Sequence, residues 1–266
     1  MNPLHIYGVF LRNIILVRRS VPRLFGLFFF VTFELFLWGF VTFWLRDLVG
    51  GNSQGDFILL ILSGLIFWHL FIRIQQSFSI AFLEEVWSRN IINFFASPIT
   101  LKEFVSGMAL LSIVQGFIAF IYVSILAFLL YNLQIWTLGF YMIPFIINIF
   151  IFGWALGLVT IALIIRFGPS ADILAFAIPF LMLPFSAVYY PVSILPPFVQ
   201  TITSFIPTRY MFEGMRMVIT EGTFSLQSAL LATGLNLIYF AVGFLIFYFT
   251  LRYAKKKGLI ARFITN

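Results

Sequence analysis

The chain has 266 residues, of which 62% are hydrophobic and 9% are charged, and its mean hydropathy is +1.08. A soluble domain of this composition would expose too much apolar surface to water, so soluble classes of protein are excluded. The formal net charge of +7 comes largely from cations that flank apolar runs, a pattern that favours membrane topology over nucleic-acid binding. The absence of cysteine excludes disulfides and thiolate metal sites.

The long apolar runs predict an all-α, polytopic membrane protein. Crossing the hydrocarbon core takes roughly 20 apolar residues as a helix. Helices also satisfy every backbone N–H and C=O internally, and the sequence lacks the short alternating segments of a membrane barrel. No internal repeat or low-complexity linker divides the chain, so we expect a single transmembrane domain over residues 1–266.

Residues 1–24 form an amphipathic, basic segment. Their apolar residues recur at helical spacing between arginines, which predicts a helix lying in the cytoplasmic interface. A short disordered lead-in is the alternative. We expect no cleaved signal peptide, because no small-residue cleavage site precedes the first apolar run. The residues that carry the pattern are Leu4, Tyr7, Phe10, Leu11, Ile14 and Ile15, with Arg12, Arg18 and Arg19 between them.

Six transmembrane spans follow from the apolar runs. They are predicted at residues 25–45, 57–83, 104–131, 137–165, 173–189 and 229–251. With an inner N-terminus, most cations fall on the inner side, and six spans place both termini in the cytoplasm. The inner cations are Arg12, Arg18, Arg19, Arg23, Arg89, Lys102, Arg166, Arg252, Lys255, Lys256, Lys257 and Arg262. The outer cations are Arg46, Arg209 and Arg216.

A polar break separates the second and third spans. Residues 84–98 predict a short amphipathic helix with acidic residues at its start and exposed Trp87, Phe94 and Phe95. Ser97-Pro98 ends it, because the residue before proline is disfavoured in the α region. Thr100 and Glu103 then form a capping box that opens the third span. The short helix either docks in a partner's groove or is an ordinary interfacial connector.

The segment 190–216 is too apolar for a free outer loop and too interrupted by proline for a span. Short helices that enter the membrane and return would explain it. Such a backbone is tolerated where protein buries it or where it lines a wet cavity. Glu213 and Arg216 lie three residues apart, so they are expected to pair on one helix face.

These two segments carry a family resemblance. The stretch Glu85-Val-Trp-Ser-Arg89 with Ser97-Pro-Ile-Thr100, and Tyr190-Pro-Val-Ser-Ile-Leu-Pro-Pro-Phe-Val-Gln200 with the later Glu213-Gly-Met-Arg216, resemble the membrane subunit of type 2 ABC exporters. That family moves lipid-linked polysaccharides, nodulation factors, drugs or other amphiphiles across bacterial inner membranes. The resemblance covers essentially the whole chain. Trp87-Ser-Arg-Asn90 departs from the Glu-Arg-Glu-x-Gly-Thr form of many drug exporters, so a lipid-linked glycan and an amphiphilic lipid or drug both remain open as substrate.

The resemblance implies a homodimeric permease served by two separate ATPase subunits, which would bind the ATP and magnesium. The chain itself has no phosphate-binding loop and is not expected to be an enzyme. The resemblance also implies that the N-terminal helix contacts the ATPase. The implied ATPase-coupling residues are Glu84, Glu85, Trp87, Arg89, Asn90, Phe94, Ser97 and Pro98. The implied re-entrant outer gate contains Tyr190, Pro191, Pro196, Pro197, Glu213 and Arg216.

A polar patch is predicted near the middle of the membrane at Glu34, His69, Arg73 and Gln76. At 1.5 Å per residue, Glu34 and Arg73 both lie roughly 14–15 Å from the inner ends of their spans. Charged groups at this depth usually pair or face water, so we expect a Glu34–Arg73 pair with His69 nearby. The pair either fixes helix packing, which we favour, or belongs to the substrate path.

Two other functions are weighed against the exporter. An ion-coupled carrier could use Glu34, His69 and Arg73, although the inverted repeat typical of such carriers is not evident. An intramembrane enzyme is disfavoured, because the chain has two histidines, no cysteine and no His-Glu-x-x-His helix. Gly153-x-x-x-Gly157 permits close helix approach, which we assign to packing within one subunit rather than to a dimer contact.

Overall fold

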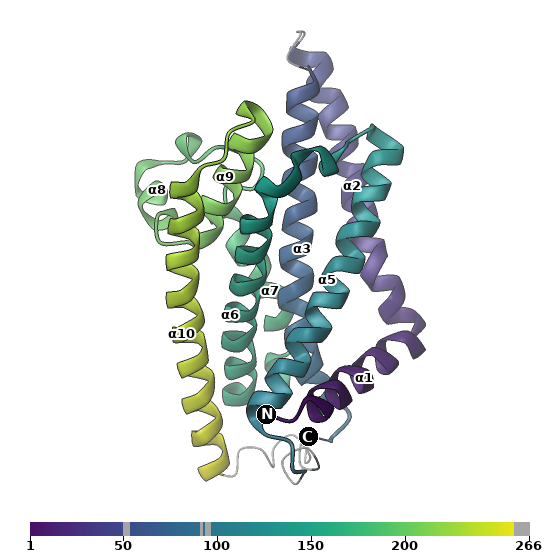
Figure 1. Ribbon diagram of the computed structural model, residues 1–266, viewed down its shortest axis with the longest axis vertical. Helices are drawn as coiled ribbons and strands as arrows, with labels where there is room; N and C mark the ends of the chain where they lie inside the picture. Colours follow the sequence, from purple (N-terminus) through teal and green to yellow (C-terminus); the bar gives the residue numbers. More distant parts are fainter. Residues whose placement is uncertain (50–53, 91–92, 94–96, 258–266) are drawn as a thin grey trace.

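The structure is a computed structural model that describes residues 1–49, 54–90, 93 and 97–257. Within these ranges every regular element is a helix, which confirms the all-α fold class. Five long helices run along the long axis of the molecule and contact one another (Figure 1). They are α2 (Val21–Val49), α3 (Gln54–Trp87), α5 (Leu101–Tyr131), α6 (Ile143–Phe167) and α10 (Leu226–Lys256).

The shorter helices lie at the two ends of this bundle. At one end α1 (Pro3–Arg19) crosses the bundle obliquely and contacts α5 and α2 (Figure 1). At the opposite end lie α8 (Pro197–Thr203) and α9 (Pro207–Glu221). The remaining elements are the 3-10 helix η1 (Ile135–Met142), η2 (Pro169–Ala171), α7 (Leu174–Met182), η3 (Leu183–Phe185) and η4 (Val192–Ile194).

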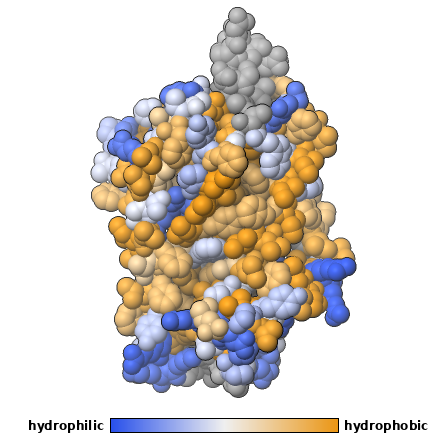
Figure 2. Space-filling model, in the orientation of Figure 1, coloured by the Kyte–Doolittle hydropathy of each residue, from blue (hydrophilic) through white to orange (hydrophobic). Residues whose placement is uncertain are grey.

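The lengths and hydropathy of the helices make this an integral membrane protein. Among the described residues, four stretches are long and apolar enough to cross a bilayer: Leu24–Trp44, Leu101–Tyr131, Leu138–Phe167 and Leu226–Lys256. Helix α3 runs alongside them and has 34 residues, about 50 Å at 1.5 Å per residue. On the face shown in Figure 2, apolar residues cover the middle of the molecule and hydrophilic residues gather towards its two ends. The six-span topology stays a prediction.

The N-terminal segment is a separate helix. Asn2 caps α1 through Oδ1, which accepts a hydrogen bond from the Leu4 amide at 3.0 Å, and Pro3 occupies the first turn. Ser20 has extended backbone angles, so α1 ends there and α2 begins at Val21. The prediction of a helix is confirmed over Pro3–Arg19, and the disordered alternative is wrong.

The start of α5 confirms the predicted capping box. The Glu103 amide donates to Thr100 Oγ1 at 3.4 Å, and the Thr100 amide donates to Glu103 Oε2 at 2.9 Å. At the other end Asn132 adopts a left-handed conformation with a φ of 56° and closes the helix through its amide. Asparagine tolerates this conformation better than other residues with a side chain, so both ends of α5 follow from local sequence.

The fourth and fifth predicted spans differ from the helices observed. The predicted span 137–165 begins as a 3-10 helix that Gly139 interrupts with a φ of 60°, and α6 starts only at Ile143. The predicted span 173–189 ends early, because α7 and η3 together stop at Phe185. These 12 apolar residues reach about 18 Å, short of the hydrocarbon thickness. Pro179 and Pro184 each remove a backbone donor, which favours this early end.

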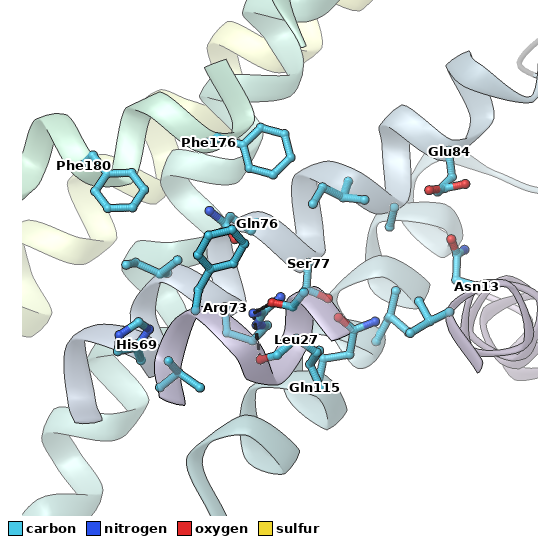
Figure 3. Close-up of a pocket in the computed structure, with 18 of the residues that line it drawn as sticks. Asn13, Leu27, His69, Arg73, Gln76, Ser77, Glu84, Gln115, Phe176 and Phe180 are labelled. Atoms are coloured by element: carbon cyan, nitrogen blue, oxygen red, sulfur yellow. Dashed lines mark hydrogen bonds between the residues drawn. The ribbon is translucent and has the colours of Figure 1, made fainter. Parts of the chain in front are cut away.

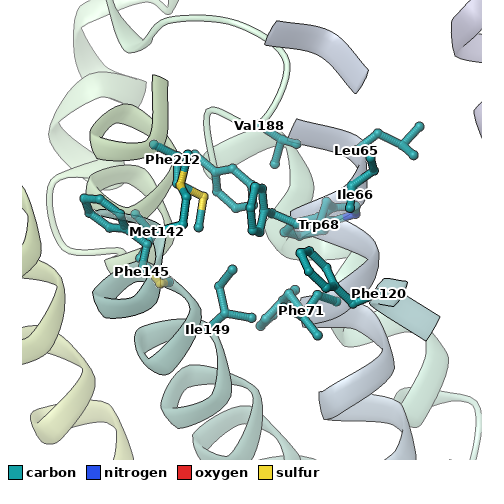
Figure 4. Packing of buried hydrophobic residues seen from close by; sticks show 14 of the residues in the cluster. Leu65, Ile66, Trp68, Phe71, Phe120, Met142, Phe145, Ile149, Val188 and Phe212 are labelled. Carbon is teal, nitrogen blue, oxygen red and sulfur yellow. The ribbon is translucent and has the colours of Figure 1, made fainter. Parts of the chain in front are cut away.

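The apolar core lies where α3, α5, α6 and α9 meet (Figure 4). Close backbone contact between α6 and α3 requires two glycines. A Cβ atom at Gly153 would lie 2.7 Å from Ile74 Cγ2, and one at Gly157 would lie 2.6 Å from Phe78 Cδ1. The prediction that this glycine pair packs within one subunit is therefore confirmed. The large buried side chains at the core include Trp68, Phe71, Phe120, Phe145 and Phe212.

Buried hydrogen bonds also fix α6 between its neighbours. Gln75 of α3 donates to Thr160 Oγ1 at 3.0 Å. Asn236 of α10 donates to the side-chain oxygen of Asn148 at 2.7 Å and to its carbonyl at 3.0 Å. Polar contacts of this kind orient helices that the hydrophobic effect alone does not hold together in lipid.

Candidate functional site

A cleft of about 430 Å³ opens on the side of the bundle and is lined by α1, α2, α3, α5 and α7. We call it the lateral cleft. Its wall is mostly apolar, and Phe176 and Phe180 of α7 face the polar side chains of α3 across it (Figure 3). The apolar residues of the wall include Leu27, Phe30, Val31, Ile72, Ile80, Ala81, Leu111, Phe176 and Phe180.

All four residues of the predicted midplane patch line this cleft. His69 Nε2 and Glu34 Oε2 lie 3.0 Å apart. Arg73 donates through Nη2 to the carbonyl oxygens of Gly26 and Leu27, at 3.3 and 3.1 Å. The predicted Glu34–Arg73 pair is therefore wrong. The register of α2 on α3 sets His69 opposite Glu34, while Arg73, one turn along α3, reaches the backbone of α2 nearer α1.

The cleft contains further polar side chains that sequence reasoning missed. Ser77 of α3 and Gln115 of α5 line it beside Arg73 and Gln76 (Figure 3). Gln76 and Gln115 are each 9% exposed, and Ser77 is 4% exposed. Within the described part of the chain, no hydrogen bond joins these three side chains to a protein group. Polar residues inside apolar spans were the available signal, but among the uncharged ones the predicted patch included only Gln76, which shares a helix face with His69 and Arg73.

The acidic residues of the predicted coupling helix lie elsewhere than expected. Glu84 and Glu85 belong to the last turn of α3, which continues to Trp87. The Asn90 amide donates to the Glu85 carbonyl at 2.9 Å and the Arg89 amide to the Val86 carbonyl at 3.0 Å. Arg89 has a φ of 53°, so this is a Schellman ending of α3. The prediction of one helix over 84–98 is wrong at its start, and Phe94 lies outside the described residues.

Glu85 points inward and ties three segments together. It is 1% exposed, forms an ion pair with Arg12 of α1, and accepts a hydrogen bond from Asn90 Nδ2 at 2.8 Å. Burial lowers the pKa of Arg12, and the negative charge of Glu84 opposes this shift. A buried carboxylate needs such partners, so Glu85 holds α1 and the turn after α3 in place.

Glu103 anchors the beginning of α1 in the same way. Its carboxylate accepts from the Asn2 amide at 2.6 Å, lies 3.1 Å from His5 Nδ1, and also caps Thr100. Two buried carboxylates, Glu85 and Glu103, therefore fasten α1 to the ends of α3 and α5. The solvent-accessible surface at this end contains Trp87, which is 45% exposed, with exposed Arg89 and Pro98 and half-buried Asn90 and Ser97.

The segment 190–216 forms short helices joined by turns at the opposite end of the bundle. Pro191 precedes η4, and Pro196 and Pro197 begin α8, positions where a proline costs no helical hydrogen bond. The Tyr190 hydroxyl donates to the Pro184 carbonyl at 2.7 Å. The Tyr190 contact ties the start of the segment to η3, which follows α7.

Glu213 and Arg216 both hold this turn, but they do so separately. Arg216 Nη2 donates to the carbonyls of Ala187 and Tyr190, at 2.8 and 3.0 Å. Glu213 accepts from the Val192 amide at 3.3 Å and lies 3.5 Å from Arg209 Nε, one helical turn before it. The predicted Glu213–Arg216 ion pair is therefore replaced by Glu213–Arg209, because Arg216 is engaged by backbone carbonyls.

Comparison with known proteins gives one family assignment. The family model described as ABC-2 type transporter matches residues 5–220. This match spans α1 to α9 and includes the lateral cleft, the end of α3 and the proline-rich segment. No curated protein matches the chain.

Proposed function

The chain belongs to the ABC-2 type transporter family, and we propose that two copies of it form the export pathway of an ATP-driven transporter. Permeases of this family work with an ABC ATPase, and we assign two separate ATPase subunits to the complex. ATP and magnesium would bind to those subunits, and this chain would perform no nucleotide chemistry. The proposed substrate is a lipid-linked glycan or an amphiphilic lipid or drug.

The observation that carries this proposal is the lateral cleft. It joins an apolar wall to a polar interior, as a path for an amphiphile requires. Beside it α2 leaves a run of phenylalanines uncovered, and a second copy on this face would turn two lateral clefts into one enclosed pathway. These exposed residues of α2 include Phe29, Phe30, Phe33 and Phe40.

The proposed ATPase contact is the end of the molecule that carries α1. Exposed Trp87 ends α3 there, exposed Arg89 follows it, and Glu85 connects this turn to α1. A movement of the turn would thus shift α1 and the base of the lateral cleft together. Nucleotide can move the equilibrium only through contacts that differ between two states, and this turn would supply those contacts.

Charge distribution supports a cytoplasmic position for the α1 end. Basic residues gather on elements that end there, whereas the opposite end has Arg46 on α2 and Arg209 and Arg216 on α9. Lys and Arg are concentrated on cytoplasmic segments of membrane proteins. We therefore place the chain in the bacterial inner membrane with both termini in the cytoplasm. The basic residues at the α1 end include Arg18, Arg19, Arg89, Lys102, Arg166, Lys255 and Lys256.

The direct test is co-expression with the candidate ATPase, followed by purification in nanodiscs and determination of the mass of the complex. We expect two copies of each subunit. Trp87→Ala should weaken the complex, whereas Phe198→Ala, which removes an exposed aromatic residue from α8 at the opposite end, should not. A chain that never co-purifies with an ATPase would overturn the proposal.

A second candidate function has one observation in its favour. Glu34 and His69 form a titratable pair inside the lateral cleft, as an ion-coupled carrier would require. Family membership favours the ATP-driven exporter. The two functions differ in their source of energy, which a transport measurement separates.

A further inference from the structure

We propose that Arg73, Gln76, Ser77 and Gln115 form a subsite for the phosphate head group of an amphiphile. The proposal deepens the proposed function and rests on it, because it assigns the charged end of the exported molecule to the lateral cleft. The subsite lies midway along the cleft, with His69 towards one end and Glu84 towards the other (Figure 3).

The first argument is the unused hydrogen-bonding capacity of this cluster. Gln76 and Gln115 are 9% exposed and Ser77 is 4% exposed, yet no described protein group bonds to any of them. Buried polar groups without partners are costly, and native structures keep few of them. Ser77 Oγ is fully buried without a partner, and the amides of Gln76 and Gln115, which reach the cleft from two helices, make no described protein hydrogen bond either, so we expect a bound molecule to complete these hydrogen bonds.

The second argument concerns the guanidinium group. Arg73 uses only Nη2 for the carbonyls of Gly26 and Leu27, and its other N–H groups have no described protein acceptor. A cation in apolar surroundings needs a compensating negative charge or water. Glu34, the carboxylate expected to supply that charge, is engaged by His69 instead.

The third argument identifies the ligand chemistry. The unused groups are rich in donors: a guanidinium, two amide NH₂ groups and a hydroxyl. Phosphate oxygens accept from all of them and also compensate the positive charge, and arginine–phosphate contacts are among the stronger hydrogen bonds. Uncharged sugar hydroxyls would leave the charge of Arg73 uncompensated. The structure therefore favours a phosphate over a neutral glycan at this position.

The fourth argument is the wall opposite the cluster. Phe176 and Phe180 of α7 face Arg73 and Gln76 across the cleft (Figure 3). Phe30 of α2 also lines the cleft and adds to its apolar wall. An acyl or polyprenyl chain would lie against these rings while the head group contacts the polar side. The volume of about 430 Å³ accommodates a head group and the first part of a chain.

The test measures binding to the purified full chain in nanodiscs of neutral lipid by native mass spectrometry. The probes are phosphatidic acid against diacylglycerol with the same chains, and a polyprenyl phosphate against the corresponding polyprenol. We expect the phosphate form of each pair to bind at least tenfold more tightly. The two pairs distinguish a glycerolipid from a polyprenyl source. Equal binding of phosphate and alcohol forms in both pairs would overturn the proposal.

Variants locate the site. Ser77→Ala and Gln115→Leu should each weaken phosphate-lipid binding roughly three- to tenfold, as expected for one lost hydrogen bond. Ser124→Ala is the matched control, because Ser124 is also buried without a partner but does not line the cleft. Unchanged binding in both Ser77→Ala and Gln115→Leu would overturn the assignment. Arg73→Gln should remove the preference for phosphate, and if it fails to fold the other two variants decide.

The same preparations separate this inference from the proposed function. An ATPase complex that forms while phosphate lipids show no preference would overturn the subsite alone. Selective phosphate-lipid binding by a chain that never associates with an ATPase would overturn the proposed function and leave the subsite standing.

Discussion

Arg12 of α1 forms an ion pair with Glu85, a carboxylate in the last turn of α3 that also accepts a hydrogen bond from Asn90. One buried side chain thus connects the N-terminal helix, the end of α3 and the turn that follows it. The arrangement would make α1 part of the proposed ATPase contact, because neither segment can move without changing the contacts of Glu85.

Replacing Glu85 with glutamine tests this connection. The change should lower ATPase stimulation and transport severalfold and reduce unfolding free energy by about 1–3 kcal/mol, because a charge-assisted contact is lost. The matched control is Glu221→Gln at the exposed end of α9. ATPase turnover and thermal melting of the complex provide the measurements. Full stimulation with Glu85→Gln would show that Glu85 has no part in coupling.

Arg89 allows charge and backbone effects to be separated. Its φ of 53° favours glycine, so Arg89→Gly should keep or raise stability by up to about 1 kcal/mol, whereas Arg89→Val should lower it. Both changes remove the charge and should weaken ATPase affinity by roughly 0.2–1 kcal/mol if Arg89 contacts the partner. If ATPase affinity falls only in the less stable Arg89→Val variant and is unchanged in Arg89→Gly, the charge of Arg89 makes no contact with the ATPase.

Gly157 should be intolerant of even one added carbon. In Gly157→Ala the new Cβ would lie 2.6 Å from Phe78 Cδ1, in a core that cannot yield, and should cost about 1–3 kcal/mol. Gly234 of α10 has no atom within 4 Å of such a Cβ, so Gly234→Ala should be neutral or stabilising. Melting temperatures in one detergent compare the two. Equal melting of both variants would refute the close contact between α6 and α3.

A double-mutant cycle can verify the pairing in the lateral cleft. Glu34→Gln and His69→Gln should be non-additive by about 0.5–3 kcal/mol, because the two side chains contact each other. Glu34→Gln and Arg73→Gln should add, because Arg73 bonds to backbone carbonyls instead. Chemical unfolding in detergent measures both cycles. Strong coupling between Glu34 and Arg73 would restore the pair first expected from the sequence.

Local sequence was sufficient for much of the fold. Long apolar runs gave the bundle, because only helices satisfy their own backbone in lipid. Two predicted features depend only on residues close together in the sequence, and the structure confirms both. They are the capping box formed by Thr100 and Glu103 and the close helix packing at Gly153 and Gly157. The helix at Pro3–Arg19 was likewise predictable from its spacing.

The site was harder to predict, because it depends on how helices are set against one another. Counting residues from the inner ends of the spans placed Glu34 and Arg73 at the same depth. In the structure the register of the two helices differs by one turn, so Glu34 contacts His69 instead. The acidic pair Glu84 and Glu85 marked a polar break in the sequence, yet α3 continues through both because α1 buries and pairs Glu85. Ser77 and Gln115 carry no charge and lie within apolar runs, so the sequence pattern did not identify them as residues of the site.

The energy source of transport tests the central claim most directly. The chain and its ATPase would be reconstituted in liposomes, and movement of a labelled polyprenyl phosphate or fluorescent amphiphile across the bilayer would be followed. We predict movement that requires ATP and stops when the phosphate-loop lysine of the ATPase is replaced. Movement that continues without ATP, follows an imposed proton gradient and disappears in Glu34→Gln would contradict this account and establish the ion-coupled carrier.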